Sequence, residues 1–198
     1  MSLEHHTFRG PNGEPIEGAT LMAHNGTAAT FIDRGATLTK LYVADRNGRV
    51  DDVVLGFDVP ARYFDPHPHI GCIVGRCANR IRHSRFTLDG QRFELTPTHP
   101  PHHLHGGPNG FHTHQWRMRL DQHRNAVEFR IVSPDGDEGY PGTVEACATY
   151  AFDGNSTLRL DIEANCDRPT PINLTAHHYF NLAGAQSVAD VGEHRVEI

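Results

Sequence analysis

Apolar and polar residues alternate most regularly in two neighbouring stretches in the second half of the chain. Residues 144–152 place an apolar side chain at every second position, and residues 158–164 repeat the pattern. Because successive side chains of a strand point to opposite faces, this period predicts two strands that each bury one face. The two stretches are close enough in sequence to be predicted as an antiparallel hairpin against the core.

Weaker alternation predicts further short strands along the rest of the chain. These are residues 20–43 (two strands with a turn near Asp33–Gly35), 53–57 (a buried strand), 85–95 (a hairpin), 116–120 and 127–131. The hairpin is marked by Asp89-Gly90, a dipeptide that favours tight turns. No stretch keeps the 3.6-residue period of a helix, so we predict an all-β chain with many short strands.

Composition agrees with a turn-rich β protein. Hydrophobic residues make up 37% of the 198 residues and charged residues 21%, with 19 glycines and 13 prolines. The formal net charge of -6 argues against nucleic acid or an anionic membrane as a partner. Apolar runs are too short to span a membrane, and the N-terminus lacks the apolar core of a secretory signal.

The four cysteines form neither a CxxC motif nor the spacing of a disulfide framework. We therefore expect reduced thiols and a cytoplasmic protein.

The most polar of the predicted strands is Pro169–Gly184, which is expected to be half-buried and to run into a turn. It carries His177 and His178 among alternating asparagines and apolar residues. Imidazole is the side chain best suited to transferring protons near neutral pH. On this stretch alone, proton transfer by His177 and a structural, hydrogen-bonded core histidine are equally open interpretations.

Gly71–Ile81 combines two glycines with two arginines and an asparagine. Glycine allows close approach of a ligand or of another backbone, and each arginine offers a rigid fork of donors. We expect Arg76 to form a structural ion pair and Arg80 to take part in the function of the protein.

Six of the 16 histidines lie in the loop at residues 97–116, namely His99, His102, His103, His105, His112 and His114. Imidazole binds metals, but this stretch has no HExxH motif and no carboxylate. We therefore predict no metal site here and expect most of these histidines at the surface, all but His105 being dispensable.

Four stretches, in order, resemble the aldose 1-epimerase (galactose mutarotase) family. They are GRCANRI at 75–81, HLHGGPNGF at 103–111, SPDGDEGYPG at 133–142 and NLTAHHYFNLAG at 173–184. The resemblance implies a large twisted antiparallel β-supersandwich with an open sugar-binding cleft. It covers only the N-terminal part of a family member, so it implies one aldose-epimerase-like domain over residues 1–198, truncated at its C-terminal end.

The resemblance also assigns roles to four residues. Asn79 and Arg80 correspond to the pair that hydrogen-bonds sugar hydroxyls, His105 to a histidine beside the ring oxygen, and His177 to the general acid. The motif differs in Ala176, where asparagine is usual, and in His178, where serine or threonine is usual. These departures affect the expected substrate preference more than the expected reaction.

Mutarotation opens a pyranose ring and closes it on the other face, by delivering one proton to the ring oxygen and removing another from the anomeric hydroxyl. The resemblance thus implies a small-molecule aldose as partner and no cofactor. The family's catalytic glutamate has no counterpart up to Ile198. We therefore expect weak or absent activity, and self-association through sheet edges that truncation exposes.

Two other classes of function remain open from the sequence. One is a non-catalytic sugar-binding module, and the other is a metal-dependent β-sandwich enzyme of cupin type that uses the histidine-rich loop. Within the family a sugar-phosphate epimerase is a further alternative, although the sequence shows no dedicated phosphate loop.

Overall fold

Strands provide most of the regular structure in this computed structural model, which describes residues 2–154, 157–188 and 190–197. In these ranges the helical elements are single 3-10 turns: η1 (Pro60–Phe64), η2 (Arg82–Ser84), η3 (Phe111–Thr113), η4 (Asp137–Gly139) and η5 (Val191–Glu193). No helix of the described ranges is long and apolar enough to cross a membrane. The prediction of an all-β chain is confirmed.

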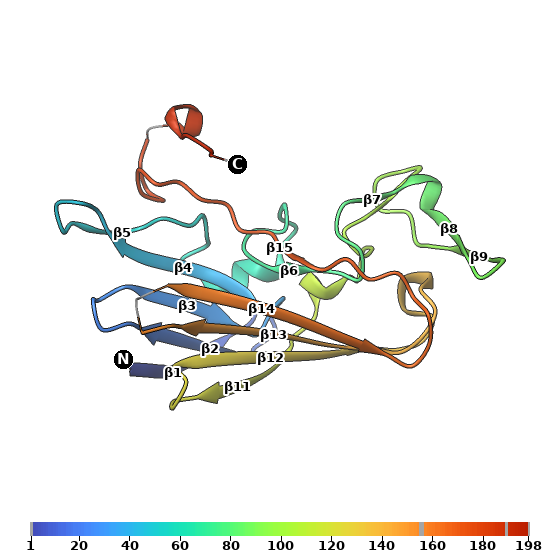
Figure 1. Ribbon diagram of the computed structural model, residues 1–198, viewed down its shortest axis with the longest axis horizontal. Coiled ribbons are helices and arrows are strands. Elements are labelled where there is room, and N and C mark those ends of the chain that lie inside the picture. Colours follow the sequence, from blue (N-terminus) through green and yellow to red (C-terminus); the bar gives the residue numbers. More distant parts are fainter. Residues whose placement is uncertain (1, 155–156, 189, 198) are drawn as a thin grey trace.

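Two antiparallel sheets form the body of the molecule (Figure 1). The first contains β1 (Ser2–Arg9), β2 (Pro15–Met22), β3 (Ala28–Ile32), β4 (Thr37–Ala44) and β5 (Val50–Asp52). The second contains β11 (Arg117–Asp121), β12 (Ala126–Ser133), β13 (Val144–Phe152) and β14 (Leu158–Cys166). Each strand pairs with its neighbour in sequence, so hairpin connections are sufficient to build both sheets.

The strongest sequence signal is confirmed as the pair β13–β14. Its register runs from Val144 opposite Cys166 to Phe152 opposite Leu158. Along β13 every second side chain is buried, and those between them are partly or fully exposed. The hairpin at 85–95 is also confirmed as β8 (Arg85–Leu88) and β9 (Gln91–Glu94).

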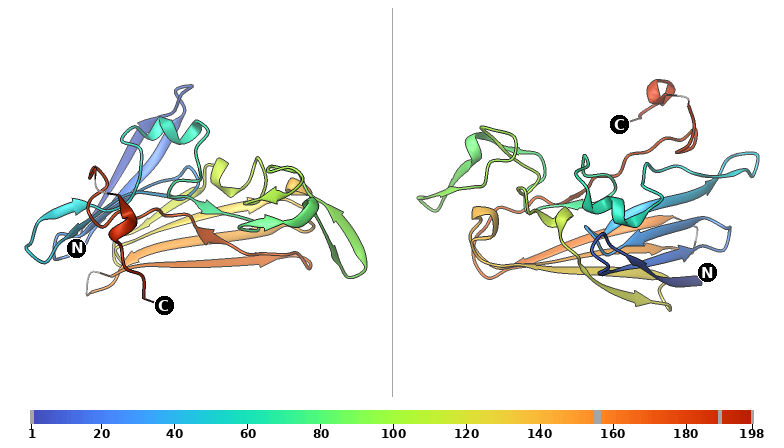
Figure 2. Two further views of the ribbon diagram at one scale, coloured as in Figure 1. Left: turned by 90° about the horizontal axis from the view of Figure 1, so that it is seen from above. Right: turned by 180° about the vertical axis from the view of Figure 1, so that it is seen from behind.

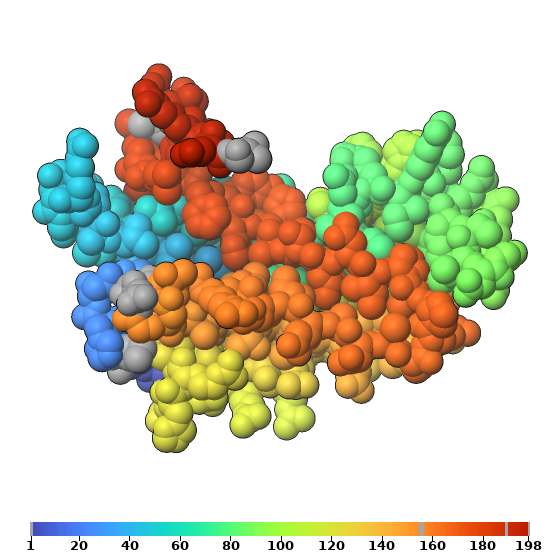
Figure 3. Space-filling view, viewed as in Figure 1, coloured from blue at the N-terminus to red at the C-terminus, as the bar shows by residue number. Residues whose placement is uncertain are grey.

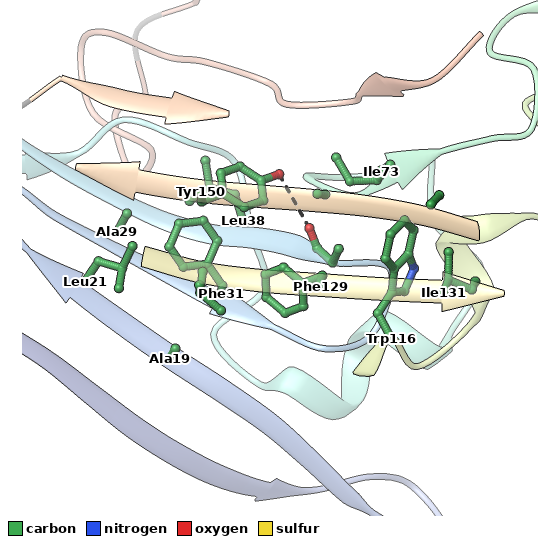
Figure 4. Packing of buried hydrophobic residues seen from close by; sticks show 14 of the residues in the cluster. Ala19, Leu21, Ala29, Phe31, Leu38, Ile73, Trp116, Phe129, Ile131 and Tyr150 are labelled. Carbon is green, nitrogen blue, oxygen red and sulfur yellow. Dashed lines mark hydrogen bonds between the residues drawn. The ribbon is translucent and has the colours of Figure 1, made fainter. Parts of the chain in front are cut away.

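The core lies between the two sheets, where aromatic side chains from both sheets meet (Figure 4). The ring centroid of Phe31 in β3 lies 4.6 Å from that of Tyr150 in β13 and 6.4 Å from that of Phe129 in β12. All three side chains are at most 1% exposed. Large buried rings dominate core energetics, so this contact joins the sheets into one sandwich.

Three small sheets and the extended C-terminal segment lie along one side of the sandwich (Figures 1 and 2). They pair β6 (Ile73–Val74) with β15 (Thr175–Ala176), β7 (Arg80–Ile81) with β10 (His103–Leu104), and β8 with β9. In the space-filling view an open hollow separates the C-terminal residues in red from the projecting green residues (Figure 3). The short strands β6 and β15 run beneath this hollow.

Two expected strands are wrong in extent. In the stretch 53–57 only Val54 forms a bridge, to Phe180, because the backbone bonds alternate between two neighbours instead of following one. Val53 N donates to Leu41 O, whereas Leu55 N donates to Tyr179 O, both at 2.9 Å. Likewise Pro169–Gly184 is extended but forms a regular strand only at β15.

Candidate active site

His177 follows β15 in the extended segment and is held by its own backbone. Its N–H donates to Cys72 O at 2.8 Å, and its carbonyl accepts from Gly71 N at 3.0 Å. On either side, β15 pairs with β6 and Leu55 N donates to Tyr179 O. Backbone hydrogen bonds on both sides of His177 fix the position from which its side chain extends, as a proton-transfer group requires.

Asn79 and His105 are joined by two reciprocal hydrogen bonds beside the pair β7–β10. His105 N donates to Asn79 O at 3.1 Å, and Asn79 N donates to His105 Nδ1 at 3.0 Å. Both residues have positive φ, 62° for Asn79 and 53° for His105. Since Nδ1 accepts a bond, the neutral ring of His105 carries its proton on Nε2.

Four imidazoles gather at this point. The ring centroids of His105 and His177 are 5.0 Å apart with planes nearly perpendicular at 82°. His69 lies 4.7 Å from His105 and 5.7 Å from His177, and His112 lies 4.4 Å from His69. We call these four residues the histidine cluster.

Burial and mutual repulsion keep most of the cluster neutral. Burial, and then the neighbouring imidazoles, lower the pKa of His69 to about 4 and that of His112 to about 3. The pKa of His105 is lowered by burial, then by His177 and Arg80. Among the described residues no aspartate or glutamate forms an ion pair with the cluster, so no carboxylate counteracts these shifts.

Arg80 and Asn79 are both exposed beside the cluster. The backbone N–H of Arg80 donates to Asn79 Oδ1 at 2.9 Å, which fixes the asparagine side chain. Arg80 also lines a hollow of about 620 Å³ with Asn173 and the β8 residues Phe86 and Leu88. The structure thus brings Asn79, His105 and His177 together and places Arg80 at their margin.

His178 lies on the core side of the segment. Its Nε2 is 3.2 Å from the hydroxyl of Tyr150, which is 1% exposed. Burial, and then the proximity of His177, lower the pKa of His178 to about 4. The role of a hydrogen-bonded core histidine, considered above for His177, therefore fits His178.

Two expectations about neighbouring residues need correction. Only His99 and His114 of the six loop histidines are exposed, whereas His103 is 0% exposed and bonded to Tyr140 OH at 2.8 Å. Arg76 is structural as expected, but its hydrogen bonds go to carbonyl oxygens and Ser133 Oγ instead of a carboxylate.

Sequence reasoning missed His69 and His112 as cluster members. His69 follows a proline-broken loop with no periodic signal, and His112 lies in a 3-10 turn among other histidines. Only the fold brings them beside His105. Despite four imidazoles, no group of three or more His, Cys, Asp or Glu residues in the described part of the chain is arranged to hold a metal ion.

Comparison with known proteins gives the family. The model of the aldose 1-epimerase family matches residues 19–198. The chain belongs to this family. It is 46% identical over 168 residues to galactose mutarotase from Sus scrofa, which covers 85% of this chain and 48% of the relative. It is 38% identical over 188 residues to aldose 1-epimerase from Escherichia coli, covering 95% of this chain and 54% of the relative.

Solved structures agree. A GalM/aldose epimerase homologue from C. elegans matches with a TM-score of 0.78 at 34% identity, covering 90% of this chain and 51% of the homologue. Galactose 1-epimerase from Lactobacillus acidophilus matches with a TM-score of 0.80 at 27% identity, covering 92% and 54%. The expected galactose mutarotase-like supersandwich is confirmed. The chain spans about half the length of the curated relatives it matches.

Proposed function

We propose that residues 1–198 act as one aldose-epimerase-like domain that binds an aldose, such as galactose or glucose, and takes part in exchanging its α and β anomers. The observation that carries this proposal is the pair His105–His177, whose rings lie 5.0 Å apart beside Asn79. In this assignment Asn79 and Arg80 bind sugar hydroxyls, His105 lies at the ring oxygen, and His177 is the general acid.

Ring opening moves two protons and breaks the bond between the ring oxygen and the anomeric carbon, and ring closure re-forms that bond. His177 donates a proton to the ring oxygen as the bond between that oxygen and the anomeric carbon breaks. A base removes the proton of the anomeric hydroxyl, which leaves an aldehyde. After rotation of the aldehyde, closure reverses both transfers. A well-placed general acid contributes about 10²–10⁴-fold to such a rate.

Among the described residues no carboxylate forms an ion pair with the histidine cluster, and we propose that the base is not among them. We therefore expect the 198-residue chain alone to bind sugar and to accelerate mutarotation only weakly. No cofactor is needed for this chemistry. The four free cysteines fit the proposed cytoplasmic location.

The test combines sugar binding with polarimetry. Titration with galactose should shift the backbone amide resonances of Asn79, Arg80, His105 and His177 in a saturable way. The optical-rotation decay of freshly dissolved α-galactose should exceed the buffer rate slightly and remain far below that of the Sus scrofa relative. His177→Ala should return the rate to that of buffer while binding persists, because the lost interaction acts in the transition state.

The control for this test is His99→Gln, which changes an exposed histidine of the same loop and should leave the rate unaltered. Saturable binding with no rate above buffer would replace the epimerase proposal with a non-catalytic sugar-binding module. One tightly bound transition metal per chain, with chelator-sensitive activity, would replace it with a metal-dependent enzyme. A rate equal to that of the relative would show that another residue of this chain, such as His178, acts as the base.

A further inference from the structure

His69 occupies a central place in the histidine cluster. Its ring contacts those of His105, His112 and His177 at centroid distances of 4.7, 4.4 and 5.7 Å. The ring is nearly parallel to that of His177, with an interplanar angle of 30°, and tilted by 56° to that of His105. One side chain therefore touches both of the histidines to which the proposed function assigns chemistry.

The backbone at His69 adopts a conformation that is uncommon for a residue with a side chain. Its φ is 58°, in the left-handed region, which is sterically unfavourable for a non-glycine residue. Local bonds hold it there. His69 N donates to His67 O at 2.9 Å, and its carbonyl accepts from the Cys72 thiol at 3.2 Å. Such conformations persist where the surroundings enforce them, and they gather at functional sites.

The same loop also supports His177 through a second ring. The ring of Tyr179 lies 5.0 Å from that of His177, and its hydroxyl donates to Pro68 O at 2.9 Å. His177 is thus flanked by His69 and by a tyrosine anchored to the residue before His69. Pro68 and His69 belong to a loop that lies outside the four family motifs by which the site was first recognised.

Charge is compatible with this packing. The groups that face His69 are the imidazoles of His67, His105, His112 and His177. Burial, followed by His105, His177 and His67, lowers the pKa of His69 to about 4. Near neutral pH the ring of His69 is uncharged and can lie against its neighbours without repulsion.

We propose that His69 is a positioning residue whose ring fixes the orientation of His105 and His177 for sugar binding and proton transfer. The ring itself, and not its ability to ionise, is what the site uses. The packing part of this proposal stands on the geometry alone, whereas the catalytic part rests on the proposed function.

Two variants of His69 and one control test whether the site needs the ring or a polar group at this position. His69→Phe keeps an aromatic ring of similar shape, His69→Gln keeps a polar group without a ring, and His99→Gln changes an exposed histidine as the matched control. Histidine side-chain NMR spectra of the 198-residue chain report the packing of His105 and His177 without any need for activity.

We expect the imidazole resonances of His105 and His177 to stay sharp and close to their original positions in H69F and H99Q. In H69Q they should broaden or move toward values of unstructured histidine. Galactose affinity and the mutarotation rate should follow, with a loss of about 10–100-fold in H69Q and less than about threefold in H69F, because small displacements of reacting groups are costly.

Unaltered His105 and His177 resonances in H69Q overturn the proposal. So does a change of these resonances that accompanies global unfolding, measured by the thermal midpoint, because His69 would then stabilise the whole fold instead of positioning two rings. Equal damage in H69F and H69Q also overturns it, since the ring would then not be what the site requires. If no variant, including the unaltered chain, exchanges anomers, the proposed function fails while the NMR comparison still decides the role of His69.

Discussion

His103 illustrates how one side chain in a histidine-rich loop can be structural when its neighbours are not. It is 0% exposed, its Nδ1 lies 2.7 Å from Thr96 O, and its Nε2 lies 2.8 Å from Tyr140 OH. Replacement by alanine removes a buried ring together with its hydrogen bonds to the buried Tyr140 hydroxyl and to Thr96 O. We expect His103→Ala to lower the free energy of unfolding by about 2–4 kcal/mol.

Urea unfolding followed by fluorescence measures this change. His99→Gln is the matched control, because His99 is exposed in the same loop, and it should alter the free energy by less than about 0.5 kcal/mol. Equal stability of the two variants would contradict the role inferred for His103 and restore the sequence-based expectation that this residue is dispensable.

Motifs located the four candidate site residues, but only the fold relates them to their surroundings. The resemblance gave His105 and His177 because both lie in recognisable stretches, and it gave no signal for His69. The difference is physical, since a ring contact such as His69–His177 joins residues 108 positions apart through a loop without periodicity. Burial of His103 is equally invisible, because it depends on Tyr140 from another loop.

At the scale of elements, β14 combines a long strand with incomplete burial. It pairs with β13 on one edge, and within the described residues no strand pairs with its other edge. Its core-facing residues Leu158, Leu160, Ile162 and Ala164 are only partly buried. A long edge strand with exposed apolar side chains is a template for association.

We therefore expect the 198-residue chain to form dimers or larger species at micromolar concentrations, and the sequence-based expectation of self-association stays a prediction. Ile162→Lys should shift the population toward monomer, because it places a charge among the partly buried apolar side chains of this edge strand. Sedimentation velocity over a range of concentrations measures the effect. The control Glu163→Lys changes the opposite face of the same strand and should leave association intact, whereas a monomeric parent chain would refute the expectation.

Regular alternation predicted elements well wherever one sheet face is buried along its whole length. β12 and β13 are examples, since each buries every second residue over most of its span. The alternation also predicted β14, whose core-facing residues are only partly buried. The prediction for 53–57 was wrong because Val53 and Leu55 bond to different neighbours, so burial there does not depend on a strand ladder. β1 escaped notice because its residues are mostly exposed.

At the scale of the whole molecule, buried histidines couple folding to pH. The pKa values of His112 and His178 are lowered to about 3 and about 4, in each case chiefly by burial. Because the unfolded chain binds protons on these rings more readily than the folded protein, acidification below about pH 6.5 favours unfolding. Asp33 acts in the opposite direction, since burial raises its pKa to about 6 and the folded protein then holds that proton more tightly.

The pKa of His69 is lowered like those of His112 and His178. Three histidines therefore oppose the single aspartate, and their effect on the free energy of unfolding prevails. We expect the free energy of unfolding to fall by roughly 1–3 kcal/mol for each pH unit between about pH 6 and 4, which corresponds to a net uptake of one to two protons. Urea midpoints measured at several pH values give this slope directly.

His112→Phe tests which ring is responsible. A phenyl ring can keep the contact with His69 but cannot bind a proton, so the variant should lose up to one proton of uptake, or about 1.4 kcal/mol per pH unit of slope. Exposed His114→Phe should leave the slope as it is. Compared with the parent chain, the variant should gain free energy of unfolding at pH 4 relative to pH 7, since protonation of His112 no longer opposes folding in acid. A parent slope near zero would contradict the coupling of folding to pH through buried histidines. An unaltered slope in H112F would mean that His112 is not one of the rings responsible.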